Sequence, residues 1–386
     1  MIRLKGMTWN HARGIQPLVA ASAEFARRHP QVTIEWDARS LLDFENYPLE
    51  QLADAYDLIM IDHPHIGTAV AEGLLHPLEE RLSAEFLEDQ ERNSVGRSYA
   101  SYTWEGRQWA LAADAAAQVS AYREDLLTAR ELPVPHTWDD VRRLASELPE
   151  GQRIGMPLVP THAFSSFFTL ISQIGNRKCW SDGSDLDEET GEQTLALLQE
   201  LMPLLHPKSV DCDPISMSDR MARTNEIAYV PLMYGYSNYA RDGFAPHAIR
   251  YCDIPSDEGG PRGSMIGGVG LAVSARTRHP DWSARFLELA VGGKFQRTSF
   301  FQNGGQPGHR SAWLDPEVNR LSGGFFAQTL RTLDLGSMRP RFDGYIEFQK
   351  QAGAWIREGI IRQDPGRKEL VRRLNAGFRQ CVKGGE

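Results

Sequence analysis

The chain has 386 residues, of which 41% are hydrophobic and 24% are charged, and its formal net charge is -9. This length exceeds what one hydrophobic core usually serves and suits two domains of a globular protein. The negative charge argues against nucleic-acid binding, which needs a basic surface, and no apolar run reaches the roughly 18 residues that a membrane-spanning helix needs.

The N-terminal part of the chain alternates predicted strands with helices. Strands are predicted at Ile2–Trp9, 32–37 and 57–61, with an amphipathic helix at 15–28 after the first strand. The third strand, DLIMI, is apolar throughout and is expected to be buried on both faces. Such alternation favours a parallel sheet with helices on both sides.

Residues 106–141 indicate a passage from one domain to another. An apolar strand at 108–113 is predicted to be interrupted by Asp114, and a second strand follows at 118–122. A helix then begins at Thr137, whose hydroxyl and the Asp140 side chain have the spacing of a capping box.

The second half continues the alternation and ends in helices. The predicted strands are 153–158, 228–231, 249–252 and 270–274. The predicted helices are 164–174, 190–205, 281–289, 345–362 and 367–382. Phe167 and Phe168 are expected in the core of this half, because they lie within an apolar helical segment.

Several motifs, taken in this order, give the chain a resemblance to a known family. They are GLLHPLEE (73–80), PHTWDD (135–140), IGGVGLAVS (266–274) and NGGQPGHRSAW (303–313). The sequence resembles the family 1 extracellular solute-binding proteins of ABC importers, which include maltose-binding protein. The resemblance implies an α/β fold of the two-lobed periplasmic-binding-protein type (type II-like), with a mostly parallel sheet flanked by helices in each lobe and a multi-strand hinge. It places the N-terminal lobe at 1–113 and 265–309 and the C-terminal lobe at 114–264 and 310–386.

Polar residues that follow strands are the first candidates for ligand contacts, because open α/β sheets bind ligands at the carboxyl ends of strands. The candidates after the first and third strands are Trp9, Asn10, His11, Arg13, Asp62, His63 and His65. Alternatively, Trp9 is core and its polar neighbours cap a helix. Asp62 at the end of a buried strand needs donors such as vicinal sugar hydroxyls.

Further candidates lie at the predicted crossovers. Asp114 either reaches a cleft between the lobes or makes a structural hydrogen bond at the hinge. Tyr234 and Tyr236 follow a strand and suit stacking on a pyranose ring. The resemblance adds the cleft-lining segment with Gly267 and Gly268, and the approximate ligand or hinge positions Arg310, Arg341 and Tyr345. Salt bridges or solvation are the alternative roles of the two arginines.

Catalytic and metal-binding motifs are not evident in the sequence. G-x-S-x-G, Walker, H-E-x-x-H and C-x-x-C patterns do not occur, so we expect neither an enzyme nor a bound metal or cofactor. His63 and His65 alone are too few ligands for a metal site. Cys179 and Cys212 are either buried free thiols or a disulfide within the second lobe.

The function expected from these features is capture of a carbohydrate, a mono- or oligosaccharide, in the interlobe cleft by hinge closure, as the substrate-binding component of an ABC importer. An anionic solute such as a sugar acid, sugar phosphate or other carboxylate is the alternative ligand, because several histidines and arginines are among the candidates. A cytoplasmic sugar-active enzyme or sensor is a second alternative.

The expected partners are the solute and the permease subunits, with no nucleic acid, and the chain is expected to be a monomer. A periplasmic or extracellular location is expected for a mature chain, and a cytoplasmic one is the alternative because MIRLKGMTW is not a signal peptide.

Overall fold

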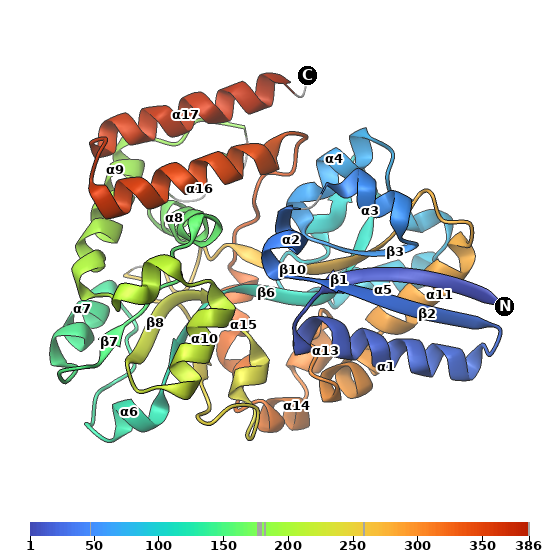
Figure 1. Cartoon of the computed structure of the whole chain (residues 1–386), viewed down its shortest axis with the longest axis horizontal. Helices are drawn as coiled ribbons and strands as arrows, with labels where there is room; N and C mark the ends of the chain where they lie inside the picture. The colour runs from blue at the N-terminus through green and yellow to red at the C-terminus, as the bar shows by residue number, and fades with distance from the viewer. Residues whose placement is uncertain (47, 176–179, 181–182, 258, 385–386) are drawn as a thin grey trace. The chain divides into compact units, whose positions relative to one another are not determined.

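The computed structural model describes residues 1–386 except 47, 176–179, 181–182, 258 and 385–386 (Figure 1). Its contacts group the chain into two compact units. Unit 1 comprises 1–115, 267–318 and 341–343, and unit 2 comprises 116–266, 319–340 and 344–386. The lobe boundaries expected from the sequence stay a prediction, and the structure groups residues 310–318 with unit 1.

The sheet of unit 1 is mostly parallel. It has the order β2-β1-β3-β10-β6, formed by β1 (Ile2–Trp9), β2 (Val32–Arg39), β3 (Leu58–Ile61), β10 (Ile266–Val273) and the first part of β6 (Ala110–Tyr122). β1 pairs in parallel with both β2 and β3, as the alternating pattern predicts, whereas β10 runs antiparallel to β3. The sheet is therefore mixed, because its late strand returns from the other half of the sequence.

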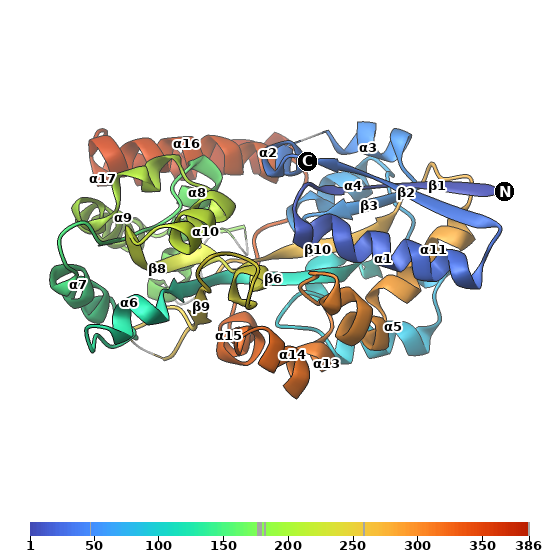
Figure 2. The same cartoon turned by 60° about the horizontal axis from the view of Figure 1, so that its bottom comes forward.

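Helices cover both faces of this sheet. In Figures 1 and 2, α1 and α11 lie on one side of β1 to β3, and α3 and α4 lie on the other. The helices of unit 1 are α1 (Ala12–Arg28), α2 (Leu41–Asn46), α3 (Leu49–Ala55), α4 (Ile66–Ala71), α5 (Ala84–Arg92), α11 (Pro280–Val291), α12 (Gly293–Phe295) and α13 (Arg310–Trp313). α14 (Pro316–Leu321) begins in unit 1 and ends in unit 2. A hairpin of β4 (Thr103–Trp104) and β5 (Arg107–Gln108) precedes β6.

The strands of unit 2 are the second part of β6 with β7 (Arg153–Ile154), β8 (Ile227–Tyr234) and β9 (Arg250–Cys252). β7 and β8 are parallel, but β6 is antiparallel to both β8 and β9, so the mostly parallel arrangement expected for this lobe does not extend to β6 and β9. β7 is also shorter than the predicted strand at 153–158. The amides of Met156 and Leu158 bond to Ser209 instead of a strand, and Pro157 has no amide to donate.

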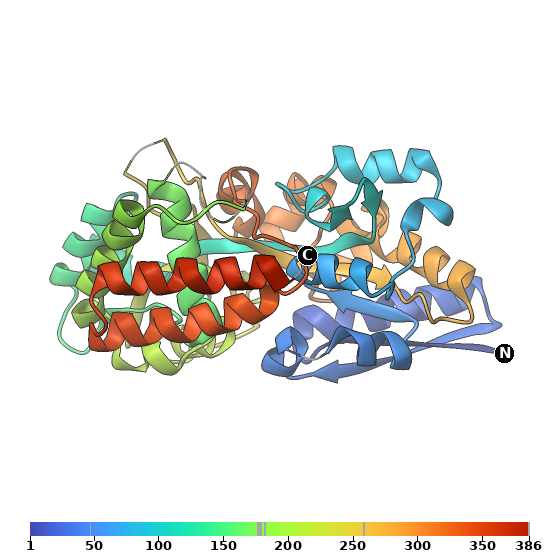
Figure 3. The same ribbon diagram turned by 90° about the horizontal axis from the view of Figure 1, so that it is seen from above.

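The helices of unit 2 are α6 (Glu124–Thr128), α7 (Trp138–Glu147), α8 (Pro160–Ile174), α9 (Glu188–Leu201), α10 (Pro214–Arg223), α15 (Phe325–Asp334), α16 (Tyr345–Arg362) and α17 (Arg367–Gly384). The capping box predicted at Thr137 and Asp140 is confirmed at the start of α7. Figure 3 shows α16 and α17 side by side. α16 also packs on α8, where a Cβ on Gly353 would lie 2.5 Å from the Pro160 carbonyl oxygen. The predicted core residues Phe167 and Phe168 are fully buried.

Asp114 does not interrupt the strand, contrary to the prediction of two strands at 108–113 and 118–122. β6 runs unbroken from Ala110 to Tyr122, and the Asp114 side chain is buried within it. A carboxylate is tolerated there because an arginine from another element pairs with it, a contact that local sequence does not reveal. Among the helices of the described residues, none has the length and apolar character needed to span a membrane.

Candidate functional site

The loop after β1 holds four of the predicted residues. Trp9 is 3% exposed and packs on Phe44 with ring centroids 5.6 Å apart. No described residue accepts a hydrogen bond from its indole Nε1. Asn10 is exposed, and its amide donates to the Arg39 carbonyl oxygen at 2.6 Å. His11 caps α1 by accepting a hydrogen bond at Nδ1 from a backbone amide. It therefore has the capping role that was the alternative to a ligand contact.

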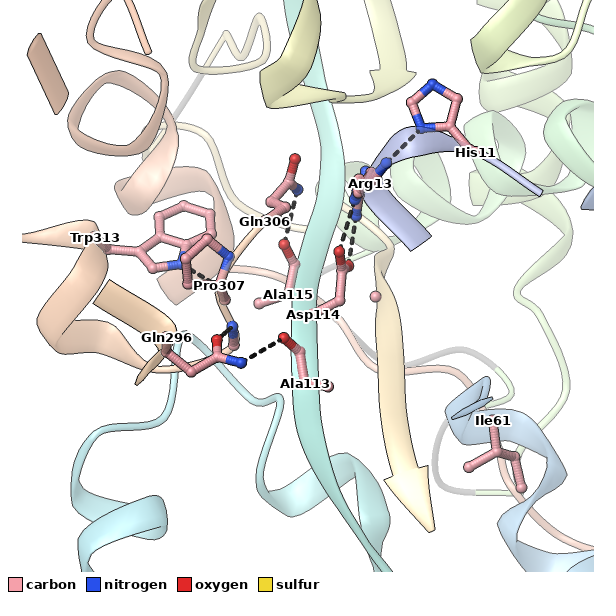
Figure 4. Close-up of polar contacts among 12 residues, drawn as sticks. His11, Arg13, Ile61, Ala113, Asp114, Ala115, Gln296, Gln306, Pro307 and Trp313 are labelled. Atoms are coloured by element: carbon pink, nitrogen blue, oxygen red, sulfur yellow. Dashed lines mark hydrogen bonds and ion pairs between the residues drawn. The ribbon is translucent and has the colours of Figure 1, made fainter. Parts of the chain in front are cut away.

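Arg13 and Asp114 form a buried ion pair (Figure 4). The guanidinium donates from Nε to Oδ2 at 2.7 Å and from Nη2 to Oδ1 at 2.5 Å, and the two side chains are 4% and 1% exposed. Burial raises the pKa of the Asp114 carboxyl, and the Arg13 charge and hydrogen bonds oppose that rise. The bidentate geometry uses both carboxylate oxygens, so Asp114 has a structural partner within unit 1.

The backbone on either side of Asp114 is held by residues 296–308, which end within the motif NGGQPGHRSAW. Gln296 Nε2 donates to the Ala113 carbonyl at 3.2 Å, and Gln306 Nε2 donates to the Ala115 carbonyl at 2.9 Å (Figure 4). A Cβ on Gly308 would lie 2.0 Å from the carbonyl oxygen of Ala112, so a glycine is required there. These contacts fix the position of the ion pair along β6.

The segment after β3 forms a compact group around Asp62. Its Oδ1 accepts a hydrogen bond from the His63 amide at 2.9 Å and lies 3.4 Å from His63 Nδ1. His63 is fully buried and edge-on to Tyr102, with ring centroids 6.4 Å apart, and His65 is half-buried at the start of α4. Among the described residues, no group of three or more His, Cys, Asp or Glu side chains is placed to hold a metal ion.

Gly267 and Gly268 lie at the start of β10. Gly268 has a φ of 91°, a conformation that favours glycine, and its carbonyl accepts a long hydrogen bond of 3.5 Å from the Tyr102 hydroxyl. The same hydroxyl donates to the Ile61 carbonyl at 3.1 Å. Tyr102 thereby connects the carboxyl end of β3 to the start of β10, a link that the sequence did not indicate.

Arg310 and Arg341 both bond to backbone carbonyls of unit 1. Arg310 Nε donates to the Ser94 carbonyl at 2.8 Å. Arg341 Nη1 donates to three carbonyls between residues 100 and 103 at 2.8, 3.1 and 2.6 Å, and its guanidinium lies 5.2 Å from the centroid of Trp104. Burial lowers the pKa of Arg341 to about 10. Both arginines therefore have hydrogen-bond partners in the backbone of unit 1, and their ligand contacts stay a prediction.

Three predicted tyrosines lie in unit 2. Tyr234 is half-buried at the end of β8, and Tyr236 is 5% exposed with its carbonyl accepting from the Tyr251 hydroxyl at 3.2 Å. Tyr345 is fully buried at the start of α16, with its ring 6.1 Å from that of Phe348. Tyr345 is thus part of the packed core of unit 2, whereas Tyr234 keeps some exposed surface.

His162 is a polar residue that the sequence reasoning missed. It lies in the first turn of α8, is 3% exposed, and contacts the Tyr234 ring at a centroid distance of 6.0 Å and an interplanar angle of 70°. Burial lowers its pKa to about 4. Pro160 at the first helical position could have indicated this placement, because proline commonly begins a helix and so puts His162 beside the preceding loop.

Comparison with known proteins places these features in a family. The profile described as bacterial extracellular solute-binding protein matches residues 8–292, which is more than half of the chain. No curated protein matches the chain in sequence. Cys179, named in the disulfide alternative, lies outside the described residues, so that alternative is untested.

Solved structures share the fold at low sequence identity. A maltose-bound protein from T. maritima has 15% identity and a TM-score of 0.83, covering 98% of this chain and 99% of its own. A solute-binding protein of an ABC transporter from Agrobacterium radiobacter, in complex with ribitol, has 19% identity and a TM-score of 0.79, covering 99% and 98%. Another from Agrobacterium vitis, with bound D-mannitol, has 13% identity and a TM-score of 0.81, covering 100% and 99%. The fold is therefore that of two-lobed solute-binding proteins, and the chain belongs to the family of bacterial extracellular solute-binding proteins.

Proposed function

We propose that this protein is the substrate-binding component of an ABC importer and that its solute is an uncharged carbohydrate or polyol. The family supports a binding role, and structures with the same fold contain maltose, ribitol and D-mannitol. Tyr234, which is half-buried at the end of β8, would supply an apolar surface on which sugar C–H groups pack. Permease subunits are the proposed protein partner.

The choice of an uncharged solute rests on one observation: the candidate arginines of unit 1 already bond to other groups within that unit. Arg13 pairs with Asp114, Arg310 bonds to the carbonyl of Ser94, and Arg341 bonds to carbonyls of residues 100–103. An anionic solute needs cationic donors to offset the loss of its hydration. Because the structure already assigns partners to these three arginines, they support the anionic alternative less than the sequence pattern does.

A matched thermal-shift screen tests the choice of solute. Each neutral compound is paired with an anionic analogue of similar shape: sorbitol with gluconate, and glucose with glucose 6-phosphate. Maltose, ribitol and mannitol complete the panel. A neutral member is expected to raise the unfolding temperature more than its anionic partner, because a ligand that binds the native state stabilises it. A larger shift with gluconate or the sugar phosphate would favour the anionic alternative.

Two further measurements separate a binder from the alternatives of enzyme and sensor. Solute recovered after prolonged incubation should be chemically unchanged, whereas hydrolysis or isomerisation products would indicate an enzyme. The expected hinge closure stays a prediction, and X-ray scattering at saturating solute should show a smaller radius of gyration than without solute. An unchanged radius would argue against closure, and recovery of a cytoplasmic partner in place of a permease would favour the sensor.

A further inference from the structure

The buried His162 ring packs on the Tyr234 ring but is not fully hydrogen-bonded. Its Nδ1 is fully buried and has no hydrogen-bond partner among the described residues. The backbone amide of His162 is satisfied by the Val159 carbonyl at 2.8 Å, so the local helix start is complete without the side chain. The ring is therefore not needed to cap α8.

The surroundings of the ring favour a neutral imidazole. Removal from water is the main effect, and the charge of Arg339 acts in the same direction, while Asp213 acts in the opposite one. A neutral imidazole carries one N–H donor and one acceptor nitrogen, which is the pattern that a sugar hydroxyl complements. Leaving a buried nitrogen such as Nδ1 without a partner costs free energy, and a bound hydroxyl would offset that cost.

The neighbouring aromatic ring adds the second half of a sugar-binding contact. Tyr234 lies at the end of β8 with its ring 6.0 Å from that of His162, and it is half-buried. An aromatic ring beside a neutral hydrogen-bonding group suits a pyranose or polyol, which has both C–H and O–H groups. A phosphate or carboxylate gains little from a neutral ring beside an aromatic group.

We propose that His162 is a solute-contacting residue of unit 2 that hydrogen-bonds a solute hydroxyl through a ring nitrogen while Tyr234 packs on the adjoining C–H groups. This assignment rests on the proposed function and adds a specificity-determining residue to it. The residue selects hydroxyl-bearing, uncharged solutes because it offers a donor and an acceptor without charge.

The test separates solute binding from stability. His162→Phe keeps a flat ring but deletes both nitrogens, and His162→Gln restores a donor and an acceptor. Tyr229→Phe is the control, because it removes a buried hydroxyl of the same unit that bonds to Ser120 at 3.0 Å. Affinity is measured by calorimetry with the panel member that stabilises the wild type most, and stability by thermal unfolding without solute.

The expected result is that His162→Phe weakens binding by roughly ten-fold or more while its solute-free unfolding temperature equals or exceeds that of the wild type, because an unsatisfied buried group has been removed. His162→Gln should recover part of the affinity. Tyr229→Phe should lower the unfolding temperature and leave the affinity unchanged. A His162→Phe variant with wild-type affinity would overturn the proposal, whatever its stability.

A measurement on the wild type covers the case in which His162→Phe does not fold. Solute addition should shift the ¹⁵N resonances of the His162 ring and leave those of His206, which lies 3.5 Å from Glu226, in place. Unshifted His162 resonances at saturation would overturn the assignment. If the wild type binds only anionic panel members, the proposed function fails first, and the same variants are measured with that anion. Binding of no panel member would contradict both proposals.

Discussion

Unit 1 and unit 2 hold their candidate polar residues in different ways. In unit 1, charged side chains are bonded within the fold: Arg13 to Asp114, and Arg341 to backbone carbonyls. In unit 2, the candidates at the end of β8 and the start of α8 are the uncharged Tyr234 and the neutral, hydrogen-bond-deficient His162. Loss of a unit 1 charge should therefore affect stability first, whereas loss of the His162 ring should affect binding first.

Breaking the Arg13–Asp114 pair should have the largest effect. Arg13→Ala or Asp114→Ala leaves a buried charge without a partner, so each should reduce the free energy of unfolding by roughly 3–5 kcal/mol. Urea denaturation measures the change. The double variant Arg13→Ala/Asp114→Ala should lose less than the sum of the two single variants, and simple additivity would show that the two side chains act independently.

His162 should make stability depend on pH in the weakly acidic range. Its pKa is about 4 in the folded protein, below the ordinary value of 6.5, so the unfolded chain binds the proton more readily. The stabilising contribution is complete above pH 6.5 and is lost as the pH falls toward 4, by roughly 2–4 kcal/mol in all. Denaturation curves across this range should show a smaller decline for His162→Gln than for the wild type. Equal declines would contradict the assignment of this shift to His162.

Arg341 should contribute moderately to the stability of unit 1. Arg341→Ala removes donors to three carbonyls of residues 100–103 and should reduce the free energy of unfolding by roughly 1–2 kcal/mol, since exposed carbonyls regain water. Arg107→Ala is the matched control, because this arginine makes an exposed ion pair with Glu80 and should cause no measurable change. If Arg341→Ala leaves the free energy of unfolding unchanged, the arginine is available for another role.

Salt should have the smallest effect. If the solute is uncharged, its dissociation constant should change by less than about two-fold between roughly 20 mM and 500 mM NaCl, because no charge pair is screened. Calorimetry at the two salt concentrations measures this directly. Marked weakening at high salt would indicate a cationic contact with the solute. It would contradict the view that the charged side chains of unit 1 serve stability and not binding.

Much of the fold could be predicted from local sequence. The period of apolar residues gave β1 and α16 with the bounds that the structure has, and the capping box at Thr137 marked the start of α7. The strand predicted at 153–158 was wrong in length, because Ser209, distant in sequence, accepts the hydrogen bonds that the Met156 and Leu158 amides would donate in a longer strand. Local sequence patterns likewise do not reveal that β6 pairs antiparallel with β8 and β9.

The sequence by itself determined the alternation of elements, the family and the kinds of side chain available after each strand, because these depend on periodicity and on motif order. Tertiary structure alone decided which of those side chains already have partners. Arg13 and Asp114 are 101 residues apart in sequence, and Tyr234 is likewise remote from His162, so their contacts exist only once the strands and helices have packed. Burial and hydrogen bonding of a polar group are set by such distant neighbours, and they distinguish a structural charge from a residue that still lacks a partner.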